Sequence, residues 1–129
     1  MKLNFQNVAI IIALVFFALA SVWMLSPETL LSSWGVEYSS SVALVSRRMA
    51  ALFAGIAVMF FVARNAEPSS ARSALVTGFV TACLTLAVLG LFELISGHAA
   101  SSILVAIFIE VTLALALLYV VRAGNNYES

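Results

Sequence analysis

The sequence predicts an all-α fold, namely an integral membrane four-helix up-down bundle with a short interfacial helix after the first span. Of the 129 residues, 64% are hydrophobic, and only 9% are charged, compared with about 25% in an ordinary soluble domain. The mean hydropathy is +1.13. A soluble fold of this length could not bury so much apolar surface, so the solvent must be lipid.

Four apolar runs are long enough to cross a bilayer as helices. A hydrocarbon core about 30 Å thick requires about 20 residues of helix, whereas a barrel strand would be about half as long and would alternate. The runs are residues 5–25, 42–63, 74–95 and 102–121. We therefore expect residues 1–129 to form a single transmembrane domain.

Polar breakers separate the four runs. After the first run, the sequence Ser26-Pro27-Glu28 predicts a new helix over residues 27–34, with Ser26 as its N-cap and Pro27 at its first position. Trp34 would lie at headgroup level, and Gly35 would end the helix. The short connections at 64–72 and 96–101 favour antiparallel neighbours.

The first run has a second interpretation as a cleaved signal peptide. Lys2 precedes the run, and Ala18-Leu19-Ala20 resembles a small-residue cleavage site. The apolar segment is longer than a usual signal core, which favours a retained helix.

The basic residues in the short loops predict the orientation. Lys2, Arg64, Arg72 and Arg122 would lie on one side, and only the Arg47-Arg48 pair on the other. This distribution favours cytoplasmic termini.

The predicted spans contain ionisable residues, which are costly there and are usually directed inward and paired. Arg47 and Arg48 lie about a turn and a half inside the second run, Glu93 lies near the end of the third, and His98 follows in the turn. Glu110 lies about 12 Å into the fourth run at the rise of an α-helix.

Small residues share the helical faces of these charges, and such residues mark close helix contacts in membranes. They are Ala51 and Gly55 beside the arginines, Gly90 beside Glu93, and Ala106 and Ala114 beside Glu110. We therefore expect the arginines to face the two carboxylates inside the bundle.

Three interpretations of this cluster remain open. It could be an ion-pair network that fixes helix register, or Glu110 could be a proton or ligand site, because a low dielectric disfavours the charged carboxylate. Alternatively, Arg48 could extend to the headgroups. The candidate ligand or proton-site residues are Arg47, Arg48, Glu93, His98 and Glu110.

No cofactor, metal site or catalytic set is expected. A single His excludes bis-histidine haem ligation within the chain, and zinc bound by Glu93, His98 and Glu110 would lack the usual number of His or Cys ligands. The lone Cys83 is interpreted as a small core residue. There is no basic patch, so nucleic acid is not an expected partner.

The segments 26–36 (SPETLLSSWGV), 46–55 (SRRMAALFAG) and 63–75 (ARNAEPSSARSAL) resemble a group of short bacterial four-span membrane proteins of unknown function. More loosely, the chain is similar to the DoxX-like and DUF4345-like four-helix proteins along nearly its whole length. The resemblance implies the bacterial inner membrane and no assigned activity. Glu93 and Glu110 correspond to no motif of these families.

Three functional hypotheses follow. The first is a non-enzymatic structural or accessory membrane subunit, which could self-associate or bind a membrane partner within the lipid bilayer. The second is a small proton-coupled transporter or carrier of an anionic or amphipathic molecule, in which Glu110 titrates and Arg47 or Arg48 attracts the substrate. The third is an enzyme acting on a lipid or quinone, which the shortage of His, Asp and Tyr in the spans disfavours.

Overall fold

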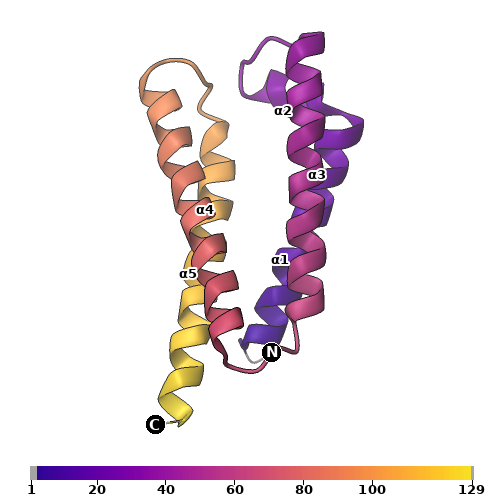
Figure 1. Ribbon diagram of the computed structural model, residues 1–129. Coiled ribbons are helices and arrows are strands. Elements are labelled where there is room, and N and C mark those ends of the chain that lie inside the picture. Colours follow the sequence, from indigo (N-terminus) through magenta and orange to yellow (C-terminus); the bar gives the residue numbers. More distant parts are fainter. Residues whose placement is uncertain (1–2, 129) are drawn as a thin grey trace.

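The fold is all-helical over the part of the chain that the structure describes (Figure 1). A computed structural model describes the backbone of residues 3–128 and the side chains of residues 3–125. The helices are α1 (Phe5–Leu25), α2 (Pro27–Ser33), α3 (Ser40–Ala63), α4 (Ser70–Ile95) and α5 (Ile103–Glu128). All except α2 are long and apolar enough to span a membrane. The chain is a multi-pass membrane protein with the predicted four-helix up-down architecture.

The long helices form two antiparallel pairs, α1 with α3 and α4 with α5, and α1 also contacts α5. Figure 1 shows both ends of the chain at one end of the bundle and α2 at the other. We call these the termini end and the α2 end. The short connections between successive helices produce this alternation, as predicted.

Side-chain caps begin three of the long helices, and two of these start earlier than the apolar runs alone suggest. Asn4 accepts a hydrogen bond from the backbone N–H of Asn7 at the start of α1. Ser39 and Ser69 cap α3 and α4 in the same way. These caps satisfy backbone donors that the first turn leaves unpaired. Consequently, α3 begins at residue 40 rather than 42 and α4 at residue 70 rather than 74.

The interfacial helix was correctly predicted with Ser26 at its N-cap position, and it ends at Ser33 rather than at residue 34. Pro27 occupies the first turn of α2, whereas the Ser26 side chain makes no capping hydrogen bond. Instead, the Ser26 N–H donates to the Val22 carbonyl and closes α1. Ser26 is the single residue between the two helices, so it is at once the C-cap of α1 and the N-cap of α2. Gly35 follows α2 with φ +74°, a left-handed conformation that glycine adopts without a steric penalty.

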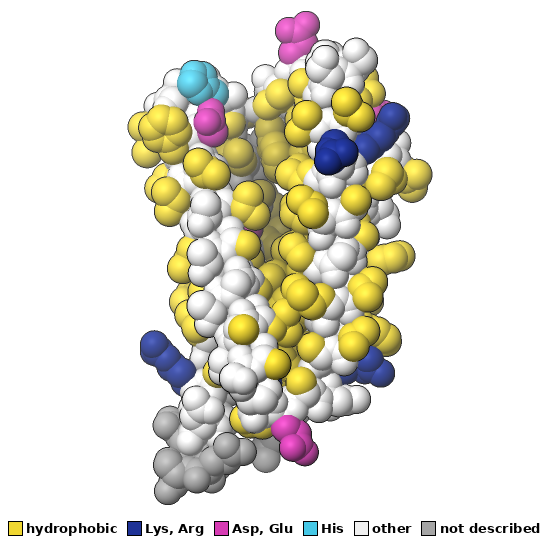
Figure 2. Space-filling model, viewed as in Figure 1, with side chains coloured by type: hydrophobic (Ala, Val, Ile, Leu, Met, Phe, Trp, Pro, Cys, Tyr) yellow, Lys and Arg dark blue, Asp and Glu magenta, His cyan; other side chains and the backbone are white. Residues whose placement is uncertain are grey.

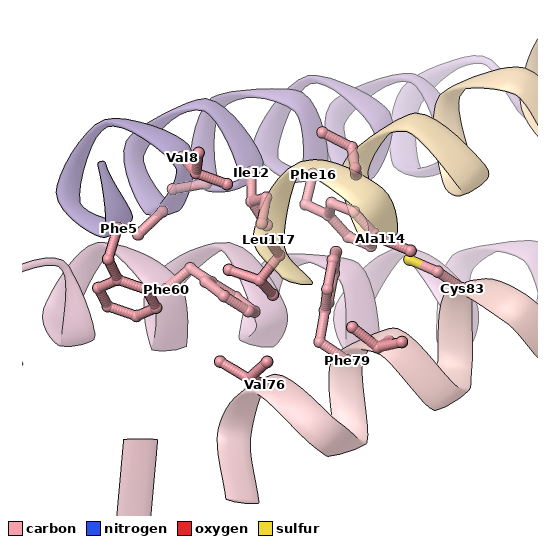
Figure 3. Close-up of a cluster of buried hydrophobic side chains, with 14 of the residues drawn as sticks. Phe5, Val8, Ile12, Phe16, Phe60, Val76, Phe79, Cys83, Ala114 and Leu117 are labelled. Carbon is pink, nitrogen blue, oxygen red and sulfur yellow. The ribbon is translucent and has the colours of Figure 1, made fainter. Parts of the chain in front are cut away.

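The apolar core lies between the two helix pairs in the half of the bundle nearer the termini (Figure 3). Phe16 of α1 makes edge-to-face contacts with Phe53 of α3 and Phe79 of α4, each with ring centroids 5.3 Å apart. Phe60 and Phe79 approach to 4.7 Å, and Leu117 of α5 is fully buried. These contacts join the two pairs.

At the α2 end, hydrogen bonds to backbone carbonyls connect the same two pairs. The Ala100 N–H, between α4 and α5, donates to the Trp34 carbonyl over 2.8 Å. The Ser102 hydroxyl donates to the Ser33 carbonyl. The pairs are therefore joined at both ends, and the space between them at the α2 end lies beneath this connection.

Candidate functional site

The structure corrects the predicted Arg/Glu cluster. Arg47 and Arg48 are both exposed on α3, and no described carboxylate lies within 4.0 Å of either guanidinium. Their face of the helix is exposed at Ala51 and Gly55 as well, so these small residues do not mark a helix contact. Instead, α3 buries the face that contains Ala43, Ser46, Ala50, Ala57 and Phe60.

The physical reason is the cost of removing a guanidinium from water. Burying an arginine requires a well-placed partner that compensates for lost hydration. A long side chain near a helix end can instead lay its methylenes along the apolar surface and keep its charge near the headgroups. Figure 2 shows basic side chains on the outside of the bundle toward the α2 end, consistent with this alternative for Arg47 and Arg48.

Glu93 contacts a different partner from the one predicted. Its Oε2 lies 2.9 Å from Nδ1 of His98, just beyond the C-terminus of α4. The side chains are 44% and 68% exposed, respectively, so this is a solvated pair rather than a buried bridge. The backbone favours the contact, because the His98 N–H donates to the Glu93 carbonyl over 2.9 Å and brings the turn back over the helix.

Glu110 is the one predicted intramembrane charge that points inward. Its residue is half-buried on α5, and Oε2 is shielded from solvent without a hydrogen-bond partner among the described residues. It lies one turn before the buried Ala114. Helical spacing therefore correctly predicted that Glu110 faces the interior. The predicted basic partner of Glu110 is not found among the described residues.

An open cavity of about 560 Å³ lies between the helix pairs at the α2 end. Figure 2 shows a hollow lined by apolar side chains between the two pairs. The α1, α2 and α3 side supplies Trp23, Leu31, Trp34, Val36, Ser41, Val42, Val45, Ser46 and Met49, and the α4–α5 side supplies Glu93, His98, Ala99 and Ile103. We call this space the outer cleft.

The outer cleft is an apolar chamber with charge at its mouth. Trp23 is 4% exposed, and its ring centroid lies 5.4 Å from that of Trp34. The Ser46 hydroxyl donates to the Val42 carbonyl in its own helix, so it offers the cleft little free polarity. The exposed Glu93–His98 pair therefore provides the only ionisable groups in the lining. Neither Arg47 nor Arg48 contributes.

Sequence reasoning missed the cleft walls. Trp34 was assigned to the headgroup level, and Ser46 was not singled out. Serine four residues after Val42 is an ordinary intrahelical pattern, and a tryptophan near a span end is typical of any membrane protein. Only the contact between the C-terminal end of α2 and the connection between α4 and α5 brings these residues around one space.

The described residues contain no group of three His, Cys, Asp or Glu side chains that could hold a metal ion. Comparisons with known proteins give no match to a family model, to a curated protein or to a solved structure. The geometry of the site must therefore support any functional proposal.

Proposed function

We propose that this protein is a membrane carrier or binding subunit for an amphipathic small molecule, which it holds in the outer cleft. The supporting observation is the apolar cavity of about 560 Å³ between the helix pairs, with Glu93 and His98 at its mouth. Ligand sites typically combine such a volume with mostly apolar walls and a few polar groups that fix orientation. The apolar body would lie against Trp23 and Met49.

The charge at the mouth favours one class of amphiphile. Glu93 can accept hydrogen bonds from an ammonium or hydroxyl head group, and bonds to a charged partner are the stronger ones. The idea of an anionic substrate depended on Arg47 or Arg48, and neither lines the cleft. We therefore propose a preference for cationic over neutral heads, and for neutral over anionic ones.

Intrinsic fluorescence offers a direct test, because the two tryptophans of the chain are Trp23 and Trp34, and both line the cleft. The purified protein would be titrated with brominated amphiphiles of equal chain length that carry an amine, an alcohol or a carboxylate head. We expect saturable quenching, strongest for the amine. Quenching that rises linearly with each amphiphile, without saturation, would contradict a defined site.

Two substitutions locate the site. Ser46→Leu fills the cleft from α3, whereas Ala51→Leu adds the same side chain on the exposed face of that helix. We expect only the first to abolish saturable quenching. Glu93→Gln should weaken amine binding by about tenfold, as expected for a lost charge-assisted hydrogen bond. Glu28→Gln, an exposed change outside the cleft, should not.

A second candidate function, proton-coupled transport, is supported by Glu110. A shielded carboxyl oxygen without a partner is a typical proton-relay group inside a membrane. In proteoliposomes, Glu110→Gln should leave amphiphile binding unchanged and abolish uptake driven by a pH gradient. Uptake equal to that of the wild type would reject this role, and a purely structural or accessory subunit would show no uptake in either protein.

We also propose a bacterial inner-membrane location with cytoplasmic termini, as the family resemblance and the loop charges imply. Arg64 and Arg72 lie at the termini end, whereas Lys2 lies outside the described residues. Reporter fusions at residue 98 and after residue 129 would test this. Activity of a periplasm-dependent reporter at residue 98 alone supports the proposed orientation, and the reverse pattern contradicts it.

A further inference from the structure

A second cavity, of about 710 Å³, lies at the termini end, far along the bundle from the outer cleft. Its lining has a different chemical character. It is formed by Leu3, Asn4, Phe5, Gln6, Arg64, Asn65, Ala66, Arg72, Tyr119, Val120, Ala123 and Gly124. Among the residues whose side chains the structure describes, this lining contains two arginines and no acidic residue. We call it the basic pocket.

The first arginine is held by its own helix end. Arg64 caps the C-terminus of α3, where its Nη1 donates to the Phe61 carbonyl and its guanidinium lies 4.0 Å from the centre of the Phe61 ring. A guanidinium has five N–H donors, so this contact uses only part of its capacity. The remaining donors can serve an anion in the pocket.

The second arginine bridges two helices. Arg72, in the first turn of α4, stacks on the ring of Phe5 in α1 at 3.9 Å and donates to the Ala66 carbonyl over 3.1 Å. Phe5 is itself 7% exposed, so the platform is rigid. Stacking and a hydrogen bond fix the position of this charge before any ligand arrives.

Neutral donors add to the two charges. The Gln6 amide, in the first turn of α1, donates over 2.8 Å to Oδ1 of Asn65 in the α3–α4 connection, which holds both residues at the pocket. The start of α1 also contributes, because the N–H groups of Phe5 and Gln6 have no intrahelical acceptor and the helix dipole favours an anion there. Glu67 follows Ala66 but does not line the pocket.

We propose that the basic pocket binds a phosphate ester. Two arginines on neighbouring elements can each engage a different phosphate oxygen, and guanidinium groups suit this geometry. The pocket lies where α1 and α4 begin and α3 ends, at the boundary of the spans. The phosphate groups of phospholipids lie at this level, and a soluble phosphate ester could also reach the site from the aqueous side.

The test is native mass spectrometry of the full chain in a mild detergent that contains equal amounts of phosphatidic acid and phosphatidylcholine. We expect the wild type to retain phosphatidic acid. The double variant Arg64→Gln/Arg72→Gln should reduce the retained fraction by at least about tenfold, as the loss of charge-assisted hydrogen bonds predicts. Arg47→Gln/Arg48→Gln, an equal charge change at the other end, should alter it less than about twofold.

Equal losses in the two double variants would overturn the proposal, since they would indicate general attraction by net charge. Wild-type retention in both would overturn it as well. Because Arg72 supports Phe5, the single variant Arg64→Gln guards against misfolding. The hydrogen bond and the ring contact of Arg64 both lie within one turn of α3, so this variant should fold and still lose phosphatidic acid severalfold.

The two sources of phosphate are separated by competition. Glycerol 3-phosphate at millimolar concentration would be added to the complex with phosphatidic acid. Complete displacement assigns the site to a soluble phosphate ester, whereas persistence of the lipid assigns it to a membrane lipid. Failure of amphiphile binding in the outer cleft would not affect either outcome, since the two cavities share no residue.

Discussion

The two halves of the space between the helix pairs differ in how they are filled. Toward the termini, Phe79 of α4 contacts both Phe16 of α1 and Phe60 of α3, and Leu117 of α5 is fully buried in the same core. Toward α2, the pairs diverge around the outer cleft. The two helix pairs are therefore held together by aromatic contacts in the half nearer the termini and by hydrogen bonds at the α2 end.

The difference arises from side-chain size on the inner face of α3. In the cleft half this face carries Ala43, Ser46 and Ala50, which let α3 approach α1 but do not extend to α4 or α5. In membranes the attraction between helices comes mainly from close packing rather than from exclusion of water. Where the side chains are too short to span the gap, the pairs remain apart.

The largest expected effect is in the filled half. Phe16→Ala removes a ring that contacts both pairs, so the free energy of unfolding should fall by about 3 kcal/mol. Its neighbour Phe17 is 64% exposed, and Phe17→Ala should change stability by less than about 0.5 kcal/mol. Reversible unfolding in mixed micelles would measure both. Similar losses for the two variants would refute the assignment of the core.

A smaller effect is expected within the α4–α5 pair, beside the cleft. A Cβ on Gly90 would lie 3.0 Å from Cγ1 of Ile107. Gly90→Ala should therefore destabilise by about 1 kcal/mol, which is the cost of overpacking less the helix-propensity gain of alanine. Gly78, on the same helix, has no such neighbour within 4 Å, and Gly78→Ala should stabilise slightly.

The cause of the Gly90 effect can be checked in a double-mutant cycle. In an Ile107→Ala background the clash is absent, so Gly90→Ala should no longer destabilise. An unchanged penalty in that background would show that the two helices do not meet at this point. The prediction would also fail if Gly78→Ala were as damaging as Gly90→Ala.

Glu110 tests the cost of a charge in the interior of the bundle. Its shielded oxygen has no described partner, so an ionised carboxylate there is uncompensated and costly. Glu110→Gln should therefore raise the thermal stability, by about 1 kcal/mol at most. Glu93→Gln should change it by less than about 0.5 kcal/mol, since that pair is solvated. A marked loss on Glu110→Gln would reveal a stabilising partner.

The smallest effect is expected in the hollow itself. Ser46→Leu adds volume where space exists, and the lost hydroxyl bond is intrahelical. Stability should therefore remain within about 0.5 kcal/mol of the wild type. Ala50, one turn further on α3, is fully buried among packed side chains, and Ala50→Leu should cost about 2 kcal/mol. If Ser46→Leu and Ala50→Leu lowered the free energy of unfolding equally, the cleft would have to be closed in solution.

The sequence was sufficient for much of the fold. Apolar runs of span length predicted α1 within its observed bounds, and Pro27 and Gly35 marked the interfacial helix. Glu110 was placed inside because its neighbours four residues away, Ala106 and Ala114, are small. The same rule failed for Arg47, because small residues also occur on lipid-facing surfaces and a long side chain can keep its charge at the boundary.

The candidate sites were less predictable. Both cavities draw residues from segments far apart in the chain, such as Trp34 with Ile103 and Phe5 with Arg72. No local pattern specifies which helix faces oppose each other, nor where two pairs diverge. The Glu93–His98 contact is local in the chain. It was not predicted, because the opposite charges of Arg47 and Arg48 favoured these two residues as the partners of Glu93.

The amino-acid sequence by itself determined that this chain forms four long helices in lipid, because hydropathy, breakers and caps act within one segment at a time. Only the tertiary structure decided which charges face inward, which remain at the boundary, and where hollows form. Those outcomes depend on how side chains of different size meet across helices, and that fit is a property of the packed pairs rather than of any single segment.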